Sequence, residues 1–304
     1  MPIIIGDCAD PHVRAVADRL PSPATILDAA AMARLPFTLT ETGLVVDGNA
    51  ATACTRRGWV RRLAPAGWTA PIRDGSLQGA SQAAWLTALA SIIRDDRTAW
   101  LSSIDAIAAA ENKPRQYRRA AAAGVRVPEW MVTTDNDAIP RGGSWVTKPL
   151  GPGHFVEGGE EQIVPTTLLT DGQRSALTAA PFIIQRCVRA VRHARVVTVR
   201  EQSFSAMLDG SDRPLDWRTD ADAHYGFTAT ATPLAVHAGA LAAAAANSVG
   251  YSSQDWILDA NGVWWFVDLN PAGQWLFLPT DVADGVSAAI AAWLADDTDT
   301  RKQS

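Results

Sequence analysis

The chain has 304 residues, enough for two domains or one elaborate domain with a large buried core. Hydrophobic residues make up 47% of the chain and charged residues 19%, a balance that excludes an intrinsically disordered protein. The 27 Lys and Arg against 32 Asp and Glu give a formal net charge of -5, which argues against a protein that binds duplex nucleic acid. We therefore expect a globular protein with no nucleic-acid partner.

The cysteines and the N-terminal residues indicate where in the cell the protein is expected. Cys8, Cys54 and Cys187 are odd in number and far apart, so they suit neither a disulfide framework nor a CxxC metal or redox site. Residues 1–7 lack the basic region of a signal peptide, and polar side chains interrupt the most apolar stretch, residues 234–249. We expect a cytoplasmic protein that does not enter a membrane.

The N-terminal third has the alternating pattern of an α/β domain. Apolar runs that suit strands lie at residues 3–5, 24–27 and 44–46, and runs with helical period lie at 11–20 and 81–93. A charged turn at residues 94–97 follows the second helix. We place the end of the N-terminal domain just after this turn, at residue 98.

The middle of the chain continues with a helix and then strands. The helix is expected over residues 106–123, and Gly124 ends it as the residue after the C-cap. Strands are expected at residues 125–133, 142–148, 182–188, 194–199 and 204–208. The strand that carries Lys148 runs into a loop rich in Gly and Pro at 151–153, where backbone N–H groups could approach an anion. The alternative is a loop that only turns the chain.

The clearest pattern is a β-hairpin in the last third. Asn261 and Gly262 form a turn signal between two apolar runs, with Asp255 before it and Asp268 and Asn270 after it. Because side chains alternate along a strand, Asp268 and Asn270 point to one face, and the hairpin brings Asp255 close to them. Carboxylate and amide oxygens without nearby Cys or His suit Mg²⁺ that holds nucleotide phosphates. The alternative is a set of polar strand ends solvated by water.

Lysine is rare in this chain. Of the 27 basic residues only Lys113, Lys148 and Lys302 are lysines, and Lys302 lies in a polar tail at residues 297–304. Arg supplies the positive charge elsewhere, so the two interior lysines favour a role that needs a compact ammonium group, such as contact with one phosphate oxygen. Two surface lysines without a role are the alternative.

Taken together, these motifs resemble the ATP-grasp superfamily, and the resemblance implies roles for them. Lys113 and Lys148 resemble its two phosphate lysines, and Arg195 resembles the catalytic arginine that contacts the terminal phosphate. The residues that resemble the inter-lobe hinge, whose backbone meets adenine, are Gln185, Arg186, Cys187 and Val188. Those that resemble the metal ligands are Asp255, Asp268 and Asn270. The implied cofactors are ATP and Mg²⁺.

Further motifs resemble one branch of that superfamily, the graspetide (microviridin-type) macrocyclases that modify ribosomal peptides. These motifs lie at residues 111–116, 127–128, 132–135, 216–218 and 269–275. The resemblance implies an α/β (α+β) class and an ATP-grasp fold with an N-terminal Rossmann-like pre-ATP-grasp domain. The implied units are the N-terminal domain 1–98, the central ATP-grasp lobe 99–184, the C-terminal lobe 185–296 and the polar tail 297–304. The implied partners are a second copy of the chain and a ribosomal precursor peptide, which has a leader and a core of acidic and Thr, Ser or Lys residues.

Three positions depart from the family pattern. Arg186 stands where the hinge often carries Glu, and His193 replaces an acid two residues before Arg195. Asp268 is a shorter substitute for the usual Glu and preserves its charge and ligand type. We therefore expect metal binding to persist with a slight shift of the ion.

The implied reaction joins a carboxylate to an amine or hydroxyl. ATP phosphorylates a Glu or Asp side chain of the peptide, and an internal hydroxyl or amine then displaces phosphate to close a macrolactone or macrolactam ring. We expect Arg218 to hold the substrate carboxylate at two points, with Asp216 orienting its guanidinium; the alternative is an exposed ion pair. Two other functions stay open: a ligase that joins free amino acids or adds residues to a peptide, and a nucleotide-binding module without turnover.

Overall fold

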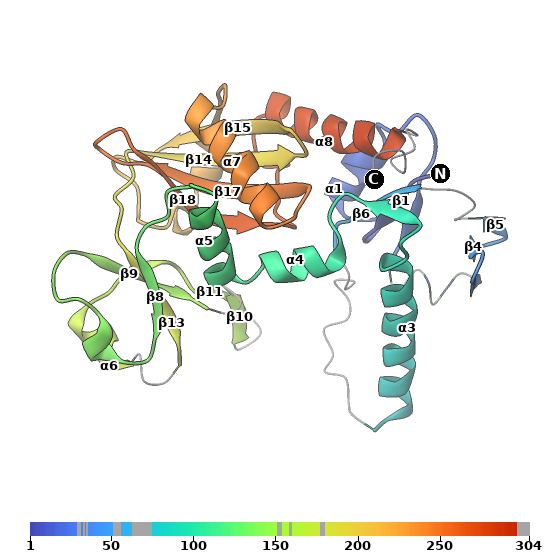
Figure 1. Ribbon diagram of the computed structural model, residues 1–304, viewed down its shortest axis with the longest axis horizontal. Helices are drawn as coiled ribbons and strands as arrows, with labels where there is room; N and C mark the ends of the chain where they lie inside the picture. The colour runs from blue at the N-terminus through green and yellow to red at the C-terminus, as the bar shows by residue number, and fades with distance from the viewer. Residues whose placement is uncertain are drawn as a thin grey trace.

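The computed structural model describes residues 1–28, 32, 34, 36–50, 56–62, 75–150, 154–157, 160–176 and 180–296. The loop expected at 151–153, the tail at 297–304 and Cys54 lie outside these residues. The described chain forms three larger sheets, here called the N-terminal, central and C-terminal sheets (Figure 1). None of the described helices has the length and apolarity that a membrane span requires.

The N-terminal sheet contains four parallel strands in the order β2-β1-β6-β7. Its strands are β1 (Ile3–Ile5), β2 (Thr25–Leu27), β6 (Arg56–Val60) and β7 (Thr98–Trp100), and its helices are α1 (Pro11–Ala17) and α3 (Leu77–Ile93). Every residue of β1 is buried, as expected when both faces of a parallel sheet are covered. The strand expected at 44–46 belongs instead to a small antiparallel sheet of β3 (Phe37–Thr40), β4 (Gly43–Val46) and β5 (Asn49–Ala50).

The single helix expected over residues 106–123 is wrong, because the structure has two helices there. They are α4 (Ile104–Ala110) and α5 (Lys113–Ala122). The chain breaks at Asn112, whose side chain caps α5 by accepting a hydrogen bond from the Arg115 N–H at 3.0 Å. Pro114 in the first turn of α5 has no N–H with which to continue the α4 ladder. Gly124 follows the C-cap with a φ of 80°, so its predicted position is confirmed.

The central sheet is antiparallel, with the strand order β12-β9-β13-β8. Its strands are β8 (Trp130–Thr133), β9 (Trp145–Pro149), β12 (Thr167–Leu168) and β13 (Phe182–Arg186). The same part of the chain also forms η1 (Asn136–Ala138), the hairpin of β10 (His154–Glu157) and β11 (Glu160–Ile163), and α6 (Asp171–Ala176). The strand expected over 125–133 begins only at Trp130, because Pro128 lacks the N–H that a strand ladder needs.

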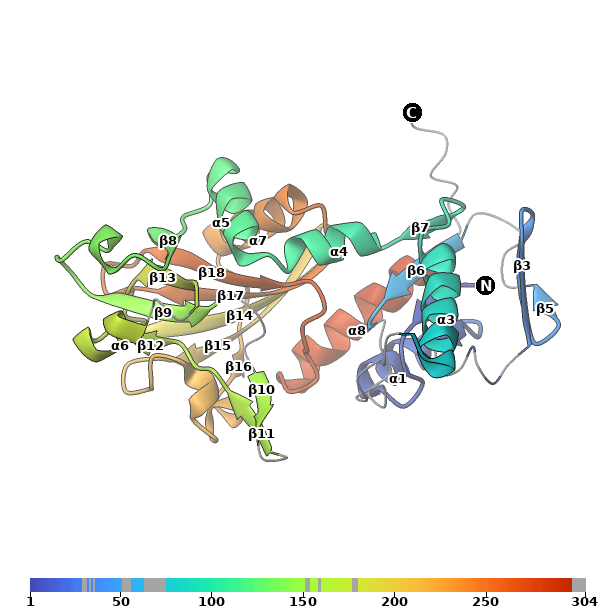
Figure 2. The ribbon, with the colours of Figure 1, turned by 90° about the horizontal axis from the view of Figure 1, so that it is seen from below.

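The C-terminal sheet is antiparallel, with the order β16-β15-β14-β17-β18. Its strands are β14 (Arg192–Val199), β15 (Gln202–Asp209), β16 (Thr228–Ala229), β17 (Tyr251–Leu258) and β18 (Trp264–Asn270). Helix α7 (Leu234–Ala246) packs on one face together with α5, and α8 (Thr280–Ala295) packs on the other (Figure 2). Because α8 also contacts α1 and β6, it joins this sheet to the N-terminal sheet.

The side chains of β14 show which residues lie on each face of the C-terminal sheet. Ala194 and Val196 are buried in the core on the α5 and α7 side, whereas Val197 and Val199 are buried in the core that contains α8. Side chains alternate along a strand, so Arg195 belongs to the α8 face. Its charge therefore stands at one end of a row of buried apolar side chains.

Candidate functional site

Three charged residues form a row across adjacent strands of the C-terminal sheet. Arg195 on β14 lies opposite Asp255 on β17, and Asp255 lies opposite Asp268 on β18. Asn270 lies farther along β18, opposite Ser253. The hairpin expected from the sequence is confirmed, and it places the two carboxylates side by side. A register shift directly after Asp255 marks a local irregularity in the ladder.

The Arg195 guanidinium is held by contacts on several sides. Its Nε lies 3.4 Å from Oδ1 of Asp255, and its Nη1 donates a hydrogen bond to Oγ of Ser253 at 3.2 Å. Its Cζ lies 5.6 Å from the ring centres of both Trp217 and Phe277, within range of a cation–π interaction. These contacts fix a positive charge beside Asp255.

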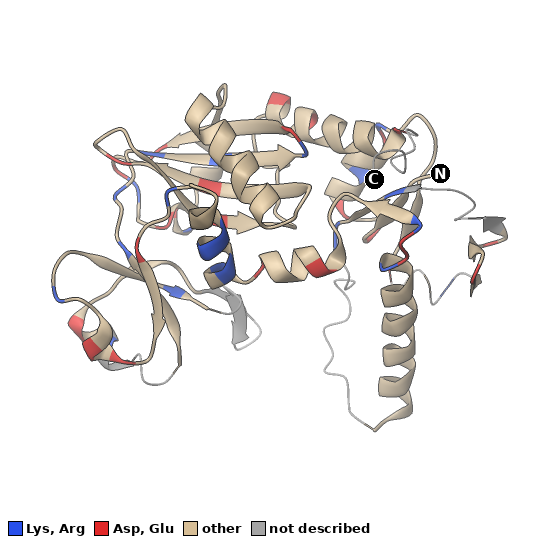
Figure 3. Cartoon of the chain, viewed as in Figure 1, with Lys and Arg blue, Asp and Glu red and all other residues tan. Residues whose placement is uncertain are grey.

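The two lysines approach the row from different elements. Lys113, the first residue of α5, donates a hydrogen bond from Nζ to Oδ1 of Asp268. Figure 3 shows that α5 carries basic residues and no acidic ones. Lys148 projects from β9 and makes no ion pair or hydrogen bond with the described residues. It interacts electrostatically with Asp268, Lys113, Asp255 and Asp216, so both lysines meet at the carboxylates.

Burial and the charges of neighbouring side chains shift the pKa values of Lys148 and Asp268. Burial lowers the pKa of the Lys148 ammonium to about 8. Burial alone would raise the pKa of the Asp268 carboxyl. The cations Lys113, Lys148 and Arg195 outweigh burial and hold that pKa below its usual value. Asp268 is therefore ionised at neutral pH and able to bind a cation.

The chain segment expected as a hinge does connect two sheets. β13 of the central sheet ends at Arg186, and β14 of the C-terminal sheet begins at Arg192. The buried Gln185 side chain shares a face of the central sheet with Lys148, as the pairing of β13 with β9 requires. The Cys187 N–H donates to the Ser144 carbonyl at 2.9 Å. The N–H of Val188 makes no hydrogen bond with the described residues.

The side chain of Arg186 lies on the other face of the central sheet, away from Lys148. Its Nη2 donates to Oε2 of Glu129 at 3.1 Å, and its Nη1 donates to the Gly142 carbonyl at 3.0 Å. Its Cζ also lies 4.2 Å from the ring centre of Trp145. The side chain of this hinge residue therefore points away from the lysines.

Asp216 and Arg218 form a two-point ion pair around η3 (Trp217–Thr219). Nε of Arg218 donates to Oδ1 of Asp216 at 2.8 Å, and Nη2 donates to Oδ2 at 2.6 Å. The Asp216 side chain is 6% exposed and also accepts the Thr166 N–H at 2.9 Å, whereas the Arg218 side chain is 44% exposed. Besides Asp216, both Asp255 and Asp268 raise the pKa of Arg218, which places its guanidinium within electrostatic reach of the row.

Gln116 is a site residue to which the sequence analysis assigned no role. Its side chain is buried, and its Nε2 donates to the Leu269 carbonyl at 2.6 Å while its Oε1 accepts the Leu269 N–H at 3.1 Å. Leu269 stands between Asp268 and Asn270, so this amide clips α5 to the strand that carries both side chains. Its sequence signal is a polar residue one helical turn after Lys113, on the buried side of α5.

His193 occupies the same face of β14 as Arg195, two residues away. Burial lowers the pKa of this imidazole, although Asp255 and Asp216 act in the opposite direction. His193 is therefore neutral at neutral pH and does not replace the charge of the acid that the family pattern has at this position.

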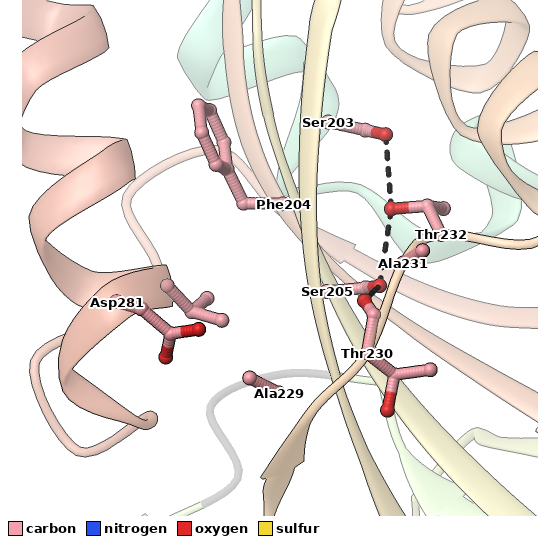
Figure 4. A pocket seen from close by; sticks show the side chains of 9 residues that line it. Ser203, Phe204, Ser205, Ala229, Thr230, Ala231, Thr232 and Asp281 are labelled. Atoms are coloured by element: carbon pink, nitrogen blue, oxygen red, sulfur yellow. Dashed lines mark hydrogen bonds between the residues drawn. The ribbon is translucent and has the colours of Figure 1, made fainter.

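A separate hollow of about 340 Å³ opens between β15, residues 229–232 and the start of α8 (Figure 4). Ser203 donates to Thr232 at 3.1 Å, and Thr232 donates to Ser205 at 3.0 Å. Ser205 lies opposite Val196, so the two serines face the side of the sheet away from Arg195. None of the residues that line the hollow belongs to the charged row, so the two sites are distinct.

No protein-family model matches the chain, and no curated protein matches it by sequence. Solved structures match nearly its whole length. A RiPP-associated ATP-grasp ligase from Chryseobacterium gregarium, solved in complex with ADP and a leader and core peptide, has a TM-score of 0.84 at 18% identity. That match covers 98% of this chain and 97% of the ligase.

Two further structures have the same architecture. The macrocyclase MdnC from Microcystis aeruginosa MRC, bound with precursor peptide MdnA, has a TM-score of 0.76 at 18% identity and covers 97% of this chain and 99% of its own. The ATP-grasp ligase PsnB, complexed with minimal precursor, Mg and ADP, has a TM-score of 0.75 at 20% identity and covers 97% and 98%. The expected α/β (α+β) class is confirmed, and this chain has the ATP-grasp fold.

Proposed function

We propose that this protein is an ATP-dependent ligase that phosphorylates Glu or Asp side chains of a ribosomal precursor peptide and joins them to a hydroxyl or amine of the same peptide. The observation that carries the proposal is the row of Arg195, Asp255 and Asp268, to which two other elements bring Lys113 and Lys148. Two adjacent carboxylates with three cations around them suit a nucleoside triphosphate with its divalent cation. The products would be ADP, phosphate and a macrolactone or macrolactam.

The residues present fit ATP and Mg²⁺. Asp255, Asp268 and Asn270 would hold the cation, because carboxylate and amide oxygens are the ligands it prefers. Nε of Arg195 is buried and makes no hydrogen bond within the described chain, so it can donate to a ligand. Bound ATP would supply the phosphoryl group that turns a carboxylate into an acyl phosphate.

The side chains of the row would stabilise charge rather than form covalent bonds. Lys113, Lys148 and Arg195 provide three positive charges around the place where the phosphates would lie. Negative charge spreads over a phosphoryl group during its transfer, and fixed cations stabilise that charge most when they need not reorganise. The reaction therefore requires no nucleophilic side chain of the protein.

The pair of Asp216 and Arg218 would position the substrate carboxylate. A guanidinium has five N–H donors, and among the described residues Arg218 donates the Nε N–H and one Nη2 N–H to Asp216. Nη1 and the second N–H of Nη2 would bind a Glu or Asp side chain of the peptide at two points. The complexes of the C. gregarium ligase, MdnC and PsnB with peptides support a peptide as the substrate here.

Mass spectrometry tests the proposal. The protein is incubated with ATP, Mg²⁺ and a precursor peptide encoded beside its gene, rich in Thr, Ser or Lys and in Glu or Asp. We expect the peptide to lose the mass of one water for each ring closed, with matching release of ADP. A gain in peptide mass would indicate a ligase that adds residues instead. ATP binding without ADP release for any such peptide would indicate a binding module.

A further inference from the structure

The N-terminal sheet has the kind of strand order at which other open α/β sheets bind ligands. β1 connects through α1 to β2 on one side, whereas β6 pairs with β1 on the other side. In such sheets ligands bind beyond the carboxyl ends of the strands, where the connections diverge. Asp10 and His12 follow β1 and Arg61 follows β6, so all three belong to this end of the sheet.

Residues 272–275, which follow the last strand of the C-terminal sheet, contact this end of the N-terminal sheet. Arg61 is 2% exposed, and its Nη1 donates hydrogen bonds to the carbonyls of Ala272 and, at 3.3 Å, of Gly273. The Trp275 N–H donates to Nε2 of His12 at 3.3 Å, and the two rings meet edge to face with centres 4.5 Å apart. Residues 272–275 therefore occupy the place where a small ligand would bind in a related sheet.

The side chains that hold this segment form one hydrogen-bonded unit. Burial and the charge of Arg61 lower the pKa of His12, so the ring is neutral at neutral pH. Asp10 can only accept and the Trp275 N–H can only donate, so the ring proton is on Nδ1, which donates to Oδ1 of Asp10 at 3.0 Å. The same carboxylate balances Arg61, whose Nε lies 3.3 Å from Oδ2. Nη2 of Arg61 also lies 3.4 Å from Nδ1 of His12, so the three side chains are in mutual contact, although Nε of Arg61 makes no hydrogen bond within the described chain.

The held segment begins two residues after a proposed metal ligand, Asn270. Oδ1 of Asn270 accepts the Ala272 N–H at 2.9 Å, and the Asn270 carbonyl accepts the Gly273 N–H at 3.3 Å. Tyr251 on β17 adds a hydrogen bond from its hydroxyl to the Gly273 carbonyl at 2.8 Å. A shift of the Ala272 and Gly273 backbone would therefore shift the oxygen that Asn270 offers to a cation.

We propose that Arg61 and His12 are positioning residues for the metal site, and that the N-terminal domain uses this end of its sheet to hold residues 272–275 and so to fix Asn270. A buried guanidinium is costly unless its donors are used, and Arg61 spends two of its hydrogen bonds on backbone carbonyls of this turn. If apolar packing alone held residues 272–275, no buried guanidinium would be needed there. The inference rests on the proposed function only for the metal role of Asn270.

The test compares substitutions of similar shape in the full chain. His12→Leu removes the acceptor for Trp275, whereas His12→Gln keeps an acceptor near the position of Nε2. Arg61→Met removes the guanidinium that donates to the Ala272 and Gly273 carbonyls. The control is Arg94→Met, which breaks an exposed ion pair with Asp105. Hydrogen exchange of residues 271–275 is measured on the protein alone. The affinity for ATP is then measured by calorimetry over a range of Mg²⁺ concentrations.

We expect faster exchange at 271–275 in His12→Leu and Arg61→Met, with unchanged exchange in β14. The Mg²⁺ concentration needed for tight ATP binding should rise about tenfold or more, as for other partners of metal ligands, while His12→Gln and Arg94→Met stay close to the original protein. Faster exchange with an unchanged Mg²⁺ requirement would overturn the inference, and so would unchanged exchange. If the original protein binds no ATP at any Mg²⁺ concentration, the proposed function fails first.

Discussion

Lys113 donates a hydrogen bond to Asp268, which joins the first residue of α5 to the strand that carries two proposed metal ligands. The side chains of Lys113 and Asp268 are 26% and 28% exposed, so water reaches both groups and can replace either partner of the pair. A divalent cation would compete with Lys113 for the same carboxylate, since both are positive. In the proposed reaction Lys113 would therefore release Asp268 to the cation and contribute its positive charge to the phosphates of bound ATP.

The first prediction follows from this pair. Asp268→Asn should lower ADP release by about 10²-fold or more, because the amide cannot hold the cation as the carboxylate does. The free energy of unfolding should change by less than about 1 kcal/mol, because partly exposed ion pairs contribute little. Steady-state kinetics and thermal unfolding measure the two effects. Near-normal turnover, or a variant that does not fold, would instead favour a polar strand end without a metal.

The second prediction uses the lowered pKa of Lys148, which is about 8. Below pH 8 the ammonium is charged and attracts the phosphates, and above pH 8 it loses its proton and this attraction. If only the charged form binds, the affinity for ATP should fall about tenfold between pH 7 and pH 9. Calorimetric Kd values at pH 7, 8 and 9 measure this change.

Lys148→Arg is the matched control for this pH dependence, because a guanidinium stays charged throughout that range. Its ATP affinity should be lower than that of the original protein at pH 7, since the planar group does not fit a site for a compact ammonium. The affinity should nevertheless stay constant up to pH 9. A parallel decline in both proteins would show that another group titrates.

The third prediction separates peptide positioning from nucleotide binding. Arg218→Ala should keep the ATP affinity and lower ring formation by about 10²-fold or more, because the carboxylate is no longer oriented. Arg213→Ala breaks a different pair in the same connection, with Asp220, and should leave ring formation intact. Mass spectrometry and calorimetry are the measurements. Equal loss of ATP binding would place Arg218 at the phosphates, and normal ring formation would make it a surface residue.

The fourth prediction concerns the Gln116 clip. Gln116→Leu keeps a similar volume but leaves the buried N–H and carbonyl of Leu269 without their partner, so the free energy of unfolding should fall by about 1–3 kcal/mol or more. Gln78→Leu, on the exposed side of α3, should change it little. Denaturant titration of both variants measures the difference. Equal stabilities would show that the clip contributes nothing.

Local patterns in the sequence determined the elements on which the site stands. The period-two alternation around Asn261 and Gly262 determined the hairpin, whereas the register shift between Asp255 and Trp256 sets Asp255 opposite Asp268 instead of Val267. The scarcity of lysine pointed to Lys113 and Lys148, both of which the structure brings to those carboxylates. These inferences needed only neighbours along the chain or composition.

Only the tertiary structure decided which distant side chains hold the site together. Arg186 and Gln185 are adjacent in sequence, yet pairing of β13 with β9 sends them to opposite faces. Gln116 meets Leu269, and Arg61 meets Ala272, across more than 150 residues of chain. Such contacts leave no periodic signal, because they depend on how separately formed sheets and helices pack. For that reason the sequence determined the charged residues of the site, while the fold decided what positions them.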